Sequence, residues 1–235
     1  YALDALTSGD NNTVIGYQAA TALTTSNDNV IIGFNAAENA TTLAENVVIG
    51  HEAMGSGVAT SGYNVAIGKE AAKSATSMSE TTAIGYQAAE QNTTGSHVIA
   101  IGYTAYDDAD TENHNLAIGT HSLGGAVAGG ENNVAVGNYT LDALTSGDSN
   151  VAVGYNAGTE VTTGYSNVIM GNGAGAGLTE GFSNVLIGAN AAHSNTTNLT
   201  TGDQNTLIGR NIQTTSADSN TANGLGYFLT CEGGY

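Results

Sequence analysis

The run "SNVAVG" at residues 149–154 is followed by "SNVIMG" at residues 166–171 and by "SNVLIG" at residues 183–188. Similar apolar runs that end in glycine recur along most of the 235-residue chain. The closing glycines are Gly16, Gly33, Gly50, Gly68, Gly85, Gly102, Gly119, Gly137, Gly154, Gly171, Gly188 and Gly209, with a weaker thirteenth at Gly226. Neighbours among the first twelve lie 17 residues apart in eight cases, 18 apart in two and 21 apart in one. Such a period indicates a repeat architecture in which each unit is one turn of a solenoid.

Asparagine keeps the same register, four residues before the glycine in ten of the twelve clear units. These residues are Asn12, Asn29, Asn46, Asn64, Asn115, Asn133, Asn150, Asn167, Asn184 and Asn205. We expect them to stack as a side-chain ladder at one corner and to adopt the left-handed turn conformation there. Glycine at the other corner removes the steric penalty of a Cβ atom where the backbone bends.

The runs themselves are too short for helices and are rich in Val and Ile, which favour strands. A second short strand is expected at a pair of threonines, followed by a polar turn. The sequence therefore predicts an all-β fold, a parallel β-solenoid with coils of about 17 residues and two strands per coil. We expect residues 1–227 to form about 13 such coils, and residues 228–235 to be a transition to a following segment.

Two irregularities of the repeat carry further expectations. The 21-residue unit between Gly188 and Gly209 should extrude its surplus residues near positions 193–200. Tyr1 corresponds to Tyr139, which lies two residues after an anchor glycine, so the chain starts in the middle of a coil. We therefore expect it to be part of a longer fibre.

Composition excludes several classes of function. Asp and Glu number 21 and Lys and Arg only 3, for a net charge of −18. Nucleic-acid binding needs a basic surface, so no nucleic-acid partner is expected. The single cysteine, Cys231, permits no intrachain disulfide. No apolar run approaches the roughly 20 residues of a membrane span, and we expect no membrane insertion by this segment.

Both faces of each predicted strand are apolar. Bulky residues such as Val65 and Ile67 alternate with a central residue, which is alanine through the middle of the chain. One set can fill the interior, and the other would form an apolar stripe of the kind that marks an interface. We expect backbones to approach closely around a symmetry axis at the small central residues, with three-fold packing. The predicted trimer interface is Ala66, Ala83, Ala100, Ala117, Ala135 and Ala152.

The unit Asn-x-Val-Ala-Ile-Gly resembles the head repeat of trimeric autotransporter adhesins, the YadA-like head, which is a left-handed β-roll. The stretches "AIGYQAA" and "NTTG" are similar to sequences in the repeats of bacteriophage tail fibres. This resemblance covers residues 1 to about 227 and implies a homotrimer of parallel left-handed β-rolls. It also implies a cell-surface receptor on a host or substrate cell as partner, and an extracellular location on a virion tail fibre or a bacterial surface.

The chain departs from the adhesin pattern in three respects. Its coil is longer than the repeat typical of adhesin heads, and the chain shows no coiled-coil stalk and no membrane anchor. Phage fibre and bacterial adhesin therefore both stay open.

Candidate chemical groups are few. Asp108, Asp110 and Glu112 alternate in the stretch at residues 107–113 and resemble the start of a calcium loop, without the glycine and closing glutamate of an EF-hand. A solvated acidic turn is the preferred interpretation, and no metal or cofactor is expected. His97 and His114 lie 17 residues apart and should stack on successive coils as exposed turn residues. The remaining histidines occupy three different columns and should converge on nothing: His51, His121 and His193.

Aromatic residues follow the anchor glycine at Tyr17, Phe34, Tyr86, Tyr103, Tyr155 and Tyr227. They predict a packing ladder between coils, with a glycan-binding edge as the alternative. We find no nucleophile elbow and no matched pair of carboxylates, so the expected function is a non-enzymatic structural or adhesive segment of an attachment fibre. Two alternatives remain: an ice-binding solenoid, because threonines recur nine and eight residues before the glycine, and a polysaccharide-degrading β-helix enzyme, which would need an acidic cluster on a sheet face.

Overall fold

The computed structural model describes residues 1–193, 200–213 and 221–223. These residues form an all-β, parallel solenoid of about 11 turns with coils of about 17 residues, as the repeat predicted. They divide into two compact units, Tyr1–Asn115 and Leu116–Tyr235. The expected transition at residues 228–235, the surplus at residues 194–199 and Tyr227 lie outside the described residues. Nowhere in the described part is there a helix long and apolar enough to cross a lipid bilayer.

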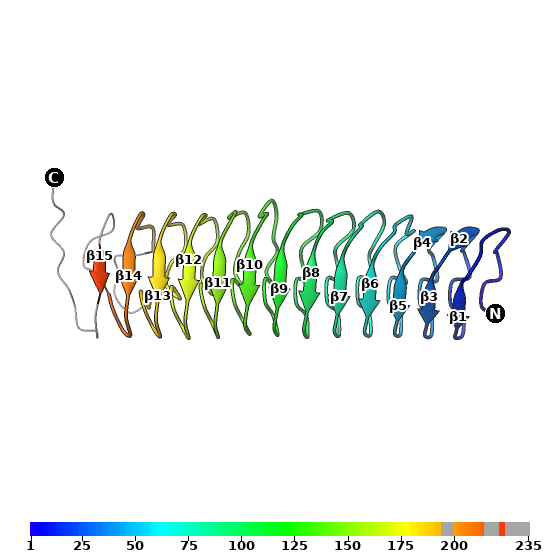
Figure 1. The fold of residues 1–235 in the computed structure, drawn as a ribbon, viewed down its shortest axis with the longest axis horizontal. Helices are drawn as coiled ribbons and strands as arrows, with labels where there is room; N and C mark the ends of the chain where they lie inside the picture. The colour runs from blue at the N-terminus through cyan, green and yellow to red at the C-terminus, as the bar shows by residue number, and fades with distance from the viewer. Residues whose placement is uncertain (194–199, 214–220, 224–235) are drawn as a thin grey trace. The chain divides into compact units, whose positions relative to one another are not determined.

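The first unit contains a main parallel sheet and a smaller one (Figure 1). Val30 pairs with Val47, and Val47 with Val65, so that neighbouring strands are 17 or 18 residues apart. The main sheet consists of β1 (Thr13–Ile15), β3 (Val30–Ile32), β5 (Val47–Ile49), β6 (Val65–Ile67), β7 (Thr82–Ile84) and β8 (Ile99–Ile101). The smaller sheet pairs β2 (Thr25–Asn27) with β4 (Thr42–Ala44).

The strands described in the second unit all belong to the main parallel sheet. Its strands are β9 (Leu116–Ile118), β10 (Val134–Val136), β11 (Val151–Val153), β12 (Val168–Met170), β13 (Val185–Ile187), β14 (Thr206–Ile208) and β15 (Thr221–Asn223). Leu207 pairs with Ala222, two residues earlier than a strand ending at Gly226 would require. The predicted thirteenth repeat is therefore wrong in register, and its sequence, with glycine on both sides of Leu225, is a poor strand former.

The prediction of two strands in every coil is only partly correct. Within the described residues, the second strand is regular in β2 and β4 alone. Elsewhere the segment still bonds coil to coil, as where the Thr145 amide donates to the Thr162 carbonyl (2.9 Å). In several coils of the second unit, Gly147, Gly164 and Gly181 stand where Ser26 and Leu43 lie in β2 and β4. Glycine in a strand interior weakens it.

The glycine that ends each main strand is required for two independent reasons. Gly154 has φ of +137°, in the region that favours glycine. A Cβ atom there would also lie 2.6 Å from the carbonyl oxygen of Gly171 on the next coil. The glycine corner predicted from the repeat is thus confirmed, and it permits direct backbone contact between coils.

The asparagine ladder is also confirmed. Asn150 donates through Nδ2 to Asn133 Oδ1 (3.1 Å), and Asn167 donates to Asn150 Oδ1 (3.0 Å). These side chains are fully buried. The left-handed conformation, however, falls on the residue before each asparagine, as at Ser149 (φ +59°) and Ser166 (φ +56°). The asparagine amide is needed inside the coil, so the turn is made by its exposed neighbour.

The assignment of the central alanines to a trimer interface is wrong. All six side chains are fully buried inside their own chain: Ala66, Ala83, Ala100, Ala117, Ala135 and Ala152. The narrow interior explains their size. In the second unit, the residue four positions after an anchor glycine shares this space with the central residue of the next strand. Leu123 and Leu141 at that position are followed by a central alanine, whereas Gly158 at the same position is followed by the larger Ile169. A Cβ atom on Gly158 would lie 2.9 Å from Ile169 Cδ1.

The ladder predicts a large loss of stability for Asn150→Ala. The change removes donors to Asn133 Oδ1 and to the Gly164 carbonyl (2.8 Å), and it leaves buried groups of Asn167 unpaired. We expect the free energy of unfolding to fall by about 2–4 kcal/mol, since each buried unsatisfied polar group costs about 1–3 kcal/mol. Urea unfolding followed by circular dichroism measures this, with the exposed Thr163→Ala as control. Equal stabilities would contradict the ladder's role.

Because Gly158 and Ile169 occupy the same part of the interior, we expect two destabilising substitutions at these positions to compensate each other partly in the free energy of unfolding. Ile169→Ala should cost about 2–5 kcal/mol through the cavity it leaves. Gly158→Leu should cost about 1–3 kcal/mol by overpacking against Ile169. The double variant restores the leucine and alanine combination of Leu141 and Ala152, so its loss should be at least about 1 kcal/mol smaller than the sum. Additive losses in the same unfolding measurement would show that the two positions do not share volume.

Candidate functional site

The outer face of the main sheet carries two apolar ladders in each unit, because the residues on either side of the buried central residue point outward. We call them the outer ladders. In the first unit they are Thr13, Val30, Val47, Val65, Thr82 and Ile99, and Ile15, Ile32, Ile49, Ile67, Ile84 and Ile101. In the second unit they are Leu116, Val134, Val151, Val168, Val185 and Thr206, and Ile118, Val136, Val153, Met170, Ile187 and Ile208. Most of these side chains are half-buried in the single chain, and the most exposed large apolar ones are Ile15 (59%), Ile208 (41%), Ile99 (40%) and Met170 (39%).

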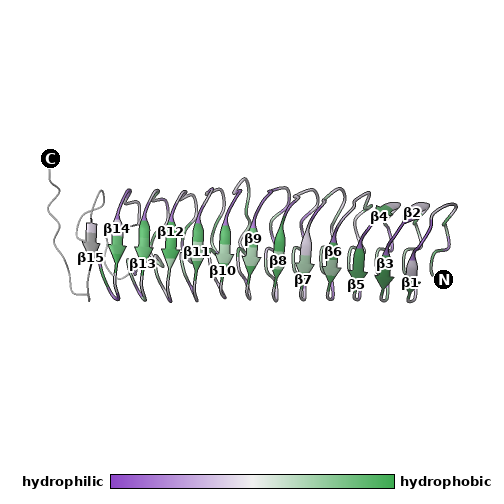
Figure 2. Cartoon of the chain, in the orientation of Figure 1, coloured by the Kyte–Doolittle hydropathy of each residue, from purple (hydrophilic) through white to green (hydrophobic). Residues whose placement is uncertain are grey.

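The outer ladders contain no charged residue, although the chain has a net charge of −18. Figure 2 shows most of their strands in green, against purple turns. Parallel sheets are normally covered on both faces, and contiguous apolar surface is typical of an interaction site. This exposed face is the strongest functional feature of the described residues, and the sequence predicted such a face while assigning it the wrong residues.

The aromatic ladder predicted after the anchor glycines is confirmed for two groups. The Tyr17 and Phe34 rings stack with centroids 5.3 Å apart, and those of Tyr86 and Tyr103 stack at 5.1 Å. Tyr155 instead meets Tyr139 edge-on at 6.0 Å. Each stacked ring covers one face of its neighbour, so these groups brace successive coils.

The paired histidines and the calcium candidate have local roles. His97 and His114 stack with centroids 4.8 Å apart, as predicted, and His97 Nε2 lies 3.3 Å from the Glu80 carboxylate. Glu112 is buried, and its Oε2 accepts hydrogen bonds from the backbone amides of Asp110 (3.1 Å) and Thr111 (3.0 Å).

The three candidate calcium ligands, for which an acidic turn is the preferred interpretation, are not brought together. Among the described residues, Asp108, Asp110 and Glu112 do not form a group of close ligand atoms. Because the Glu112 carboxylate is held by the backbone of its own loop, it is not turned toward an ion shared with the other two acids.

A charged cluster lies in the first unit, at the glycine corners that follow β5 and β6. Lys73 Nζ lies 2.9 Å from Glu52 Oε2 and 3.9 Å from Glu70 Oε1, and Lys69 Nζ lies 3.3 Å from the same Glu70 oxygen. Gln87 donates to Glu70 Oε2 (2.7 Å). Two of the three Lys and Arg residues of the chain thus gather at one corner.

Electrostatics within this cluster shift three pKa values. Burial alone would raise the pKa of Glu70, but hydrogen bonds from Gln87 and Lys69 and the charges of both lysines lower it. The hydrogen bond to Glu52 raises the pKa of Lys73. Burial raises the pKa of Glu90, and repulsion from Glu70 raises it further. Glu70 and Lys73 are therefore ionised together at neutral pH.

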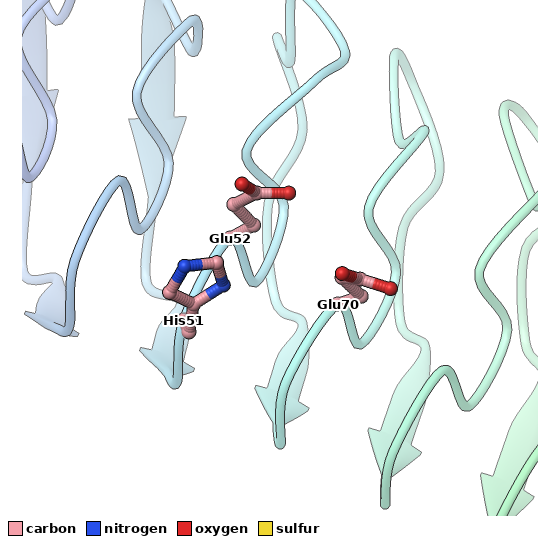
Figure 3. Close-up of side chains that lie close together, drawn as sticks. All are labelled: His51, Glu52 and Glu70. Carbon is pink, nitrogen blue, oxygen red and sulfur yellow. The ribbon is translucent and has the colours of Figure 1, made fainter.

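His51 joins this cluster, contrary to the expectation that it converges on nothing. Ligand atoms of His51, Glu52 and Glu70 all lie within 4.8 Å of one another. Figure 3 shows His51 and Glu52 on one coil and Glu70 on the next. The signal that could have revealed the group is the repeat itself, since Glu52 and Glu70 occupy the same column and His51 precedes Glu52.

Comparison of the chain with protein-family models, curated proteins and solved structures finds no match. The family resemblance therefore stays a prediction from the repeat motif.

The raised pKa of Glu90 predicts a pH-dependent gain from Glu90→Gln. When folding raises the pKa of a carboxyl group, the ionised group destabilises the folded protein at any pH above the folded-state pKa. At a pH below the unfolded-state pKa the group is protonated in both states, and the destabilisation is absent. The variant should therefore melt at a higher temperature than the parent near pH 7, and the difference should vanish as the pH falls below about 4.3, the usual pKa of glutamate. Melting followed by circular dichroism tests this, with the exposed Glu160→Gln as control. A gain that persists at low pH would rule out the electrostatic cause.

Proposed function

We propose that this chain is a non-enzymatic segment of a homotrimeric extracellular attachment fibre, built from left-handed β-rolls. The observation that carries the proposal is the partly exposed, uncharged face formed by the outer ladders in each unit. Branched aliphatic side chains in regular rows suit tight packing against a second apolar sheet, and their exposure in a single chain favours a partner that covers them.

A second copy of the chain is the partner that charge favours. Every copy carries a net charge of −18, so contact through most of its surface would be repelled. The outer ladders offer a contact in which no carboxylate is buried, and burying unpaired charge is the main cost that such an association must avoid. Three-fold assembly is the form implied by the resemblance to YadA-like heads and tail-fibre repeats.

The fibre role includes attachment to a receptor on a host or substrate cell, on a virion or a bacterial surface. The acidic balance argues against nucleic acid as the partner. A glycan receptor would meet ring edges at the corners of the coils, since the faces of Phe34 and Tyr86 are used in stacking.

The two other function classes have less support. An ice-binding face needs free threonine hydroxyls, but Thr24 Oγ1 donates to the Thr41 carbonyl (3.1 Å), and Thr145 Oγ1 donates to that of Thr162 (3.0 Å). A polysaccharide-degrading enzyme needs acids on a sheet face, and the outer ladders have none.

The proposal predicts that Val153→Lys dissociates the assembly. Val153 belongs to an outer ladder, so the lysine remains partly exposed in one chain and the coil should keep its circular dichroism spectrum. Around a three-fold axis three ammonium groups would meet, and light scattering coupled to size-exclusion chromatography should show a shift from trimer to monomer mass. Thr163→Lys, at an exposed turn, should leave the trimer intact. A monomeric parent chain, or a trimeric Val153→Lys variant, would overturn the proposal.

A further inference from the structure

We propose that His51, Glu52 and Glu70 bind a divalent transition-metal ion, of which Zn²⁺ is the representative. Their ligand atoms lie within 4.8 Å of one another, close enough to share one ion. One residue supplies an imidazole nitrogen and the other two supply carboxylate oxygens, and zinc accepts both kinds of ligand. This inference concerns one chain and is independent of the fibre function.

The backbone positions the three side chains before any ion binds. Glu52 and Glu70 lie on successive coils, where the Glu52 amide donates to the Phe34 carbonyl (2.9 Å) and the Glu70 amide to that of His51 (2.9 Å). Both residues have positive φ, +56° and +60°. The same backbone turn thus repeats one coil apart and directs both carboxylates to one side of the corner (Figure 3).

Neighbouring groups restrain the ligands further. The His51 ring stacks on the Phe34 ring with centroids 5.1 Å apart and an interplanar angle of 6°. The Gln87 amide holds Glu70 Oε2 at 2.7 Å. Such supporting contacts orient metal ligands and strengthen binding.

The two carboxylates already hold a cation, the Lys73 ammonium, at 2.9 Å from Glu52 and 3.9 Å from Glu70. A divalent ion bound between the two carboxylates would take the place of the Lys73 ammonium, and it would bring two positive charges where the ammonium has one. The Lys73 side chain is 25% exposed, so it can turn away, and Glu90 is near enough to interact with its charge. Lys73 is therefore a competitor that weakens metal binding without preventing it.

The donor set selects the class of ion. Calcium and magnesium prefer sites made of oxygen ligands, whereas imidazole favours zinc, nickel and copper. Three protein ligands at a partly exposed corner leave the remaining positions to water. The arrangement therefore fits a transition-metal ion more closely than calcium.

Isothermal titration of the whole chain with zinc chloride tests the site. Glu70→Gln and His51→Ala should each weaken the zinc affinity by about tenfold or more. Lys73→Met should act in the opposite direction and tighten it by about fivefold, because a positive charge next to the ion is lost. The matched controls are His97→Ala and Glu80→Gln, which disrupt another exposed histidine–glutamate pair and should leave the affinity unchanged.

A second readout keeps the test independent of folding defects. Cobalt(II) should give a visible absorption band with the parent chain that is lost in His51→Ala, and circular dichroism reports whether each variant is folded. Glu52→Gln, which keeps the side-chain shape, replaces any variant that does not fold. The proposal is overturned if zinc does not bind, if the ligand variants bind as well as the parent, or if Lys73→Met binds more weakly.

Discussion

Direct backbone contact between successive coils is the constraint on which the rest of this structure depends. At the corner after each main strand, the chain approaches the next coil so closely that a Cβ atom on Gly154 would lie 2.6 Å from the Gly171 carbonyl oxygen. The glycine also has a φ that other residues rarely adopt. The missing Cβ therefore permits the stacking distance that the backbone hydrogen bonds between coils require, and this places equivalent side chains of successive coils next to one another.

Stacking at that distance turns every column of the repeat into a ladder. Inside the coil, asparagines such as Asn150 bond to the asparagines above and below, so that their buried amides remain paired. On the outside of the coil, aromatic rings stack on rings of the next coil, and charged side chains form ion pairs with it. The interior is narrow, and a large side chain in one column, such as Ile169, requires a small one in another, such as Gly158.

The same ladders create the two candidate sites. The outer ladders expose rows of uncharged aliphatic side chains on a strongly acidic chain, which favours self-association as the way to cover them. At the glycine corner, the period places Glu70 one coil away from Glu52, beside His51 and Lys73. Residues about 18 positions apart in sequence thereby become neighbours, and a site arises from two coils that neither contains alone.

The sequence by itself determined the period, the parallel pairing, the glycine corner and the asparagine ladder, because each depends on residues repeated in register. It also predicted the stacking of His97 on His114. It could not decide which face of a strand is inside, since Ala135 and its neighbours Val134 and Val136 are all apolar and alternation alone is symmetric. Only the closed coil resolves this: its interior has room for alanine opposite leucine, and the bulkier valines are left outside. The His51 site, likewise, appears only when side-chain directions are known.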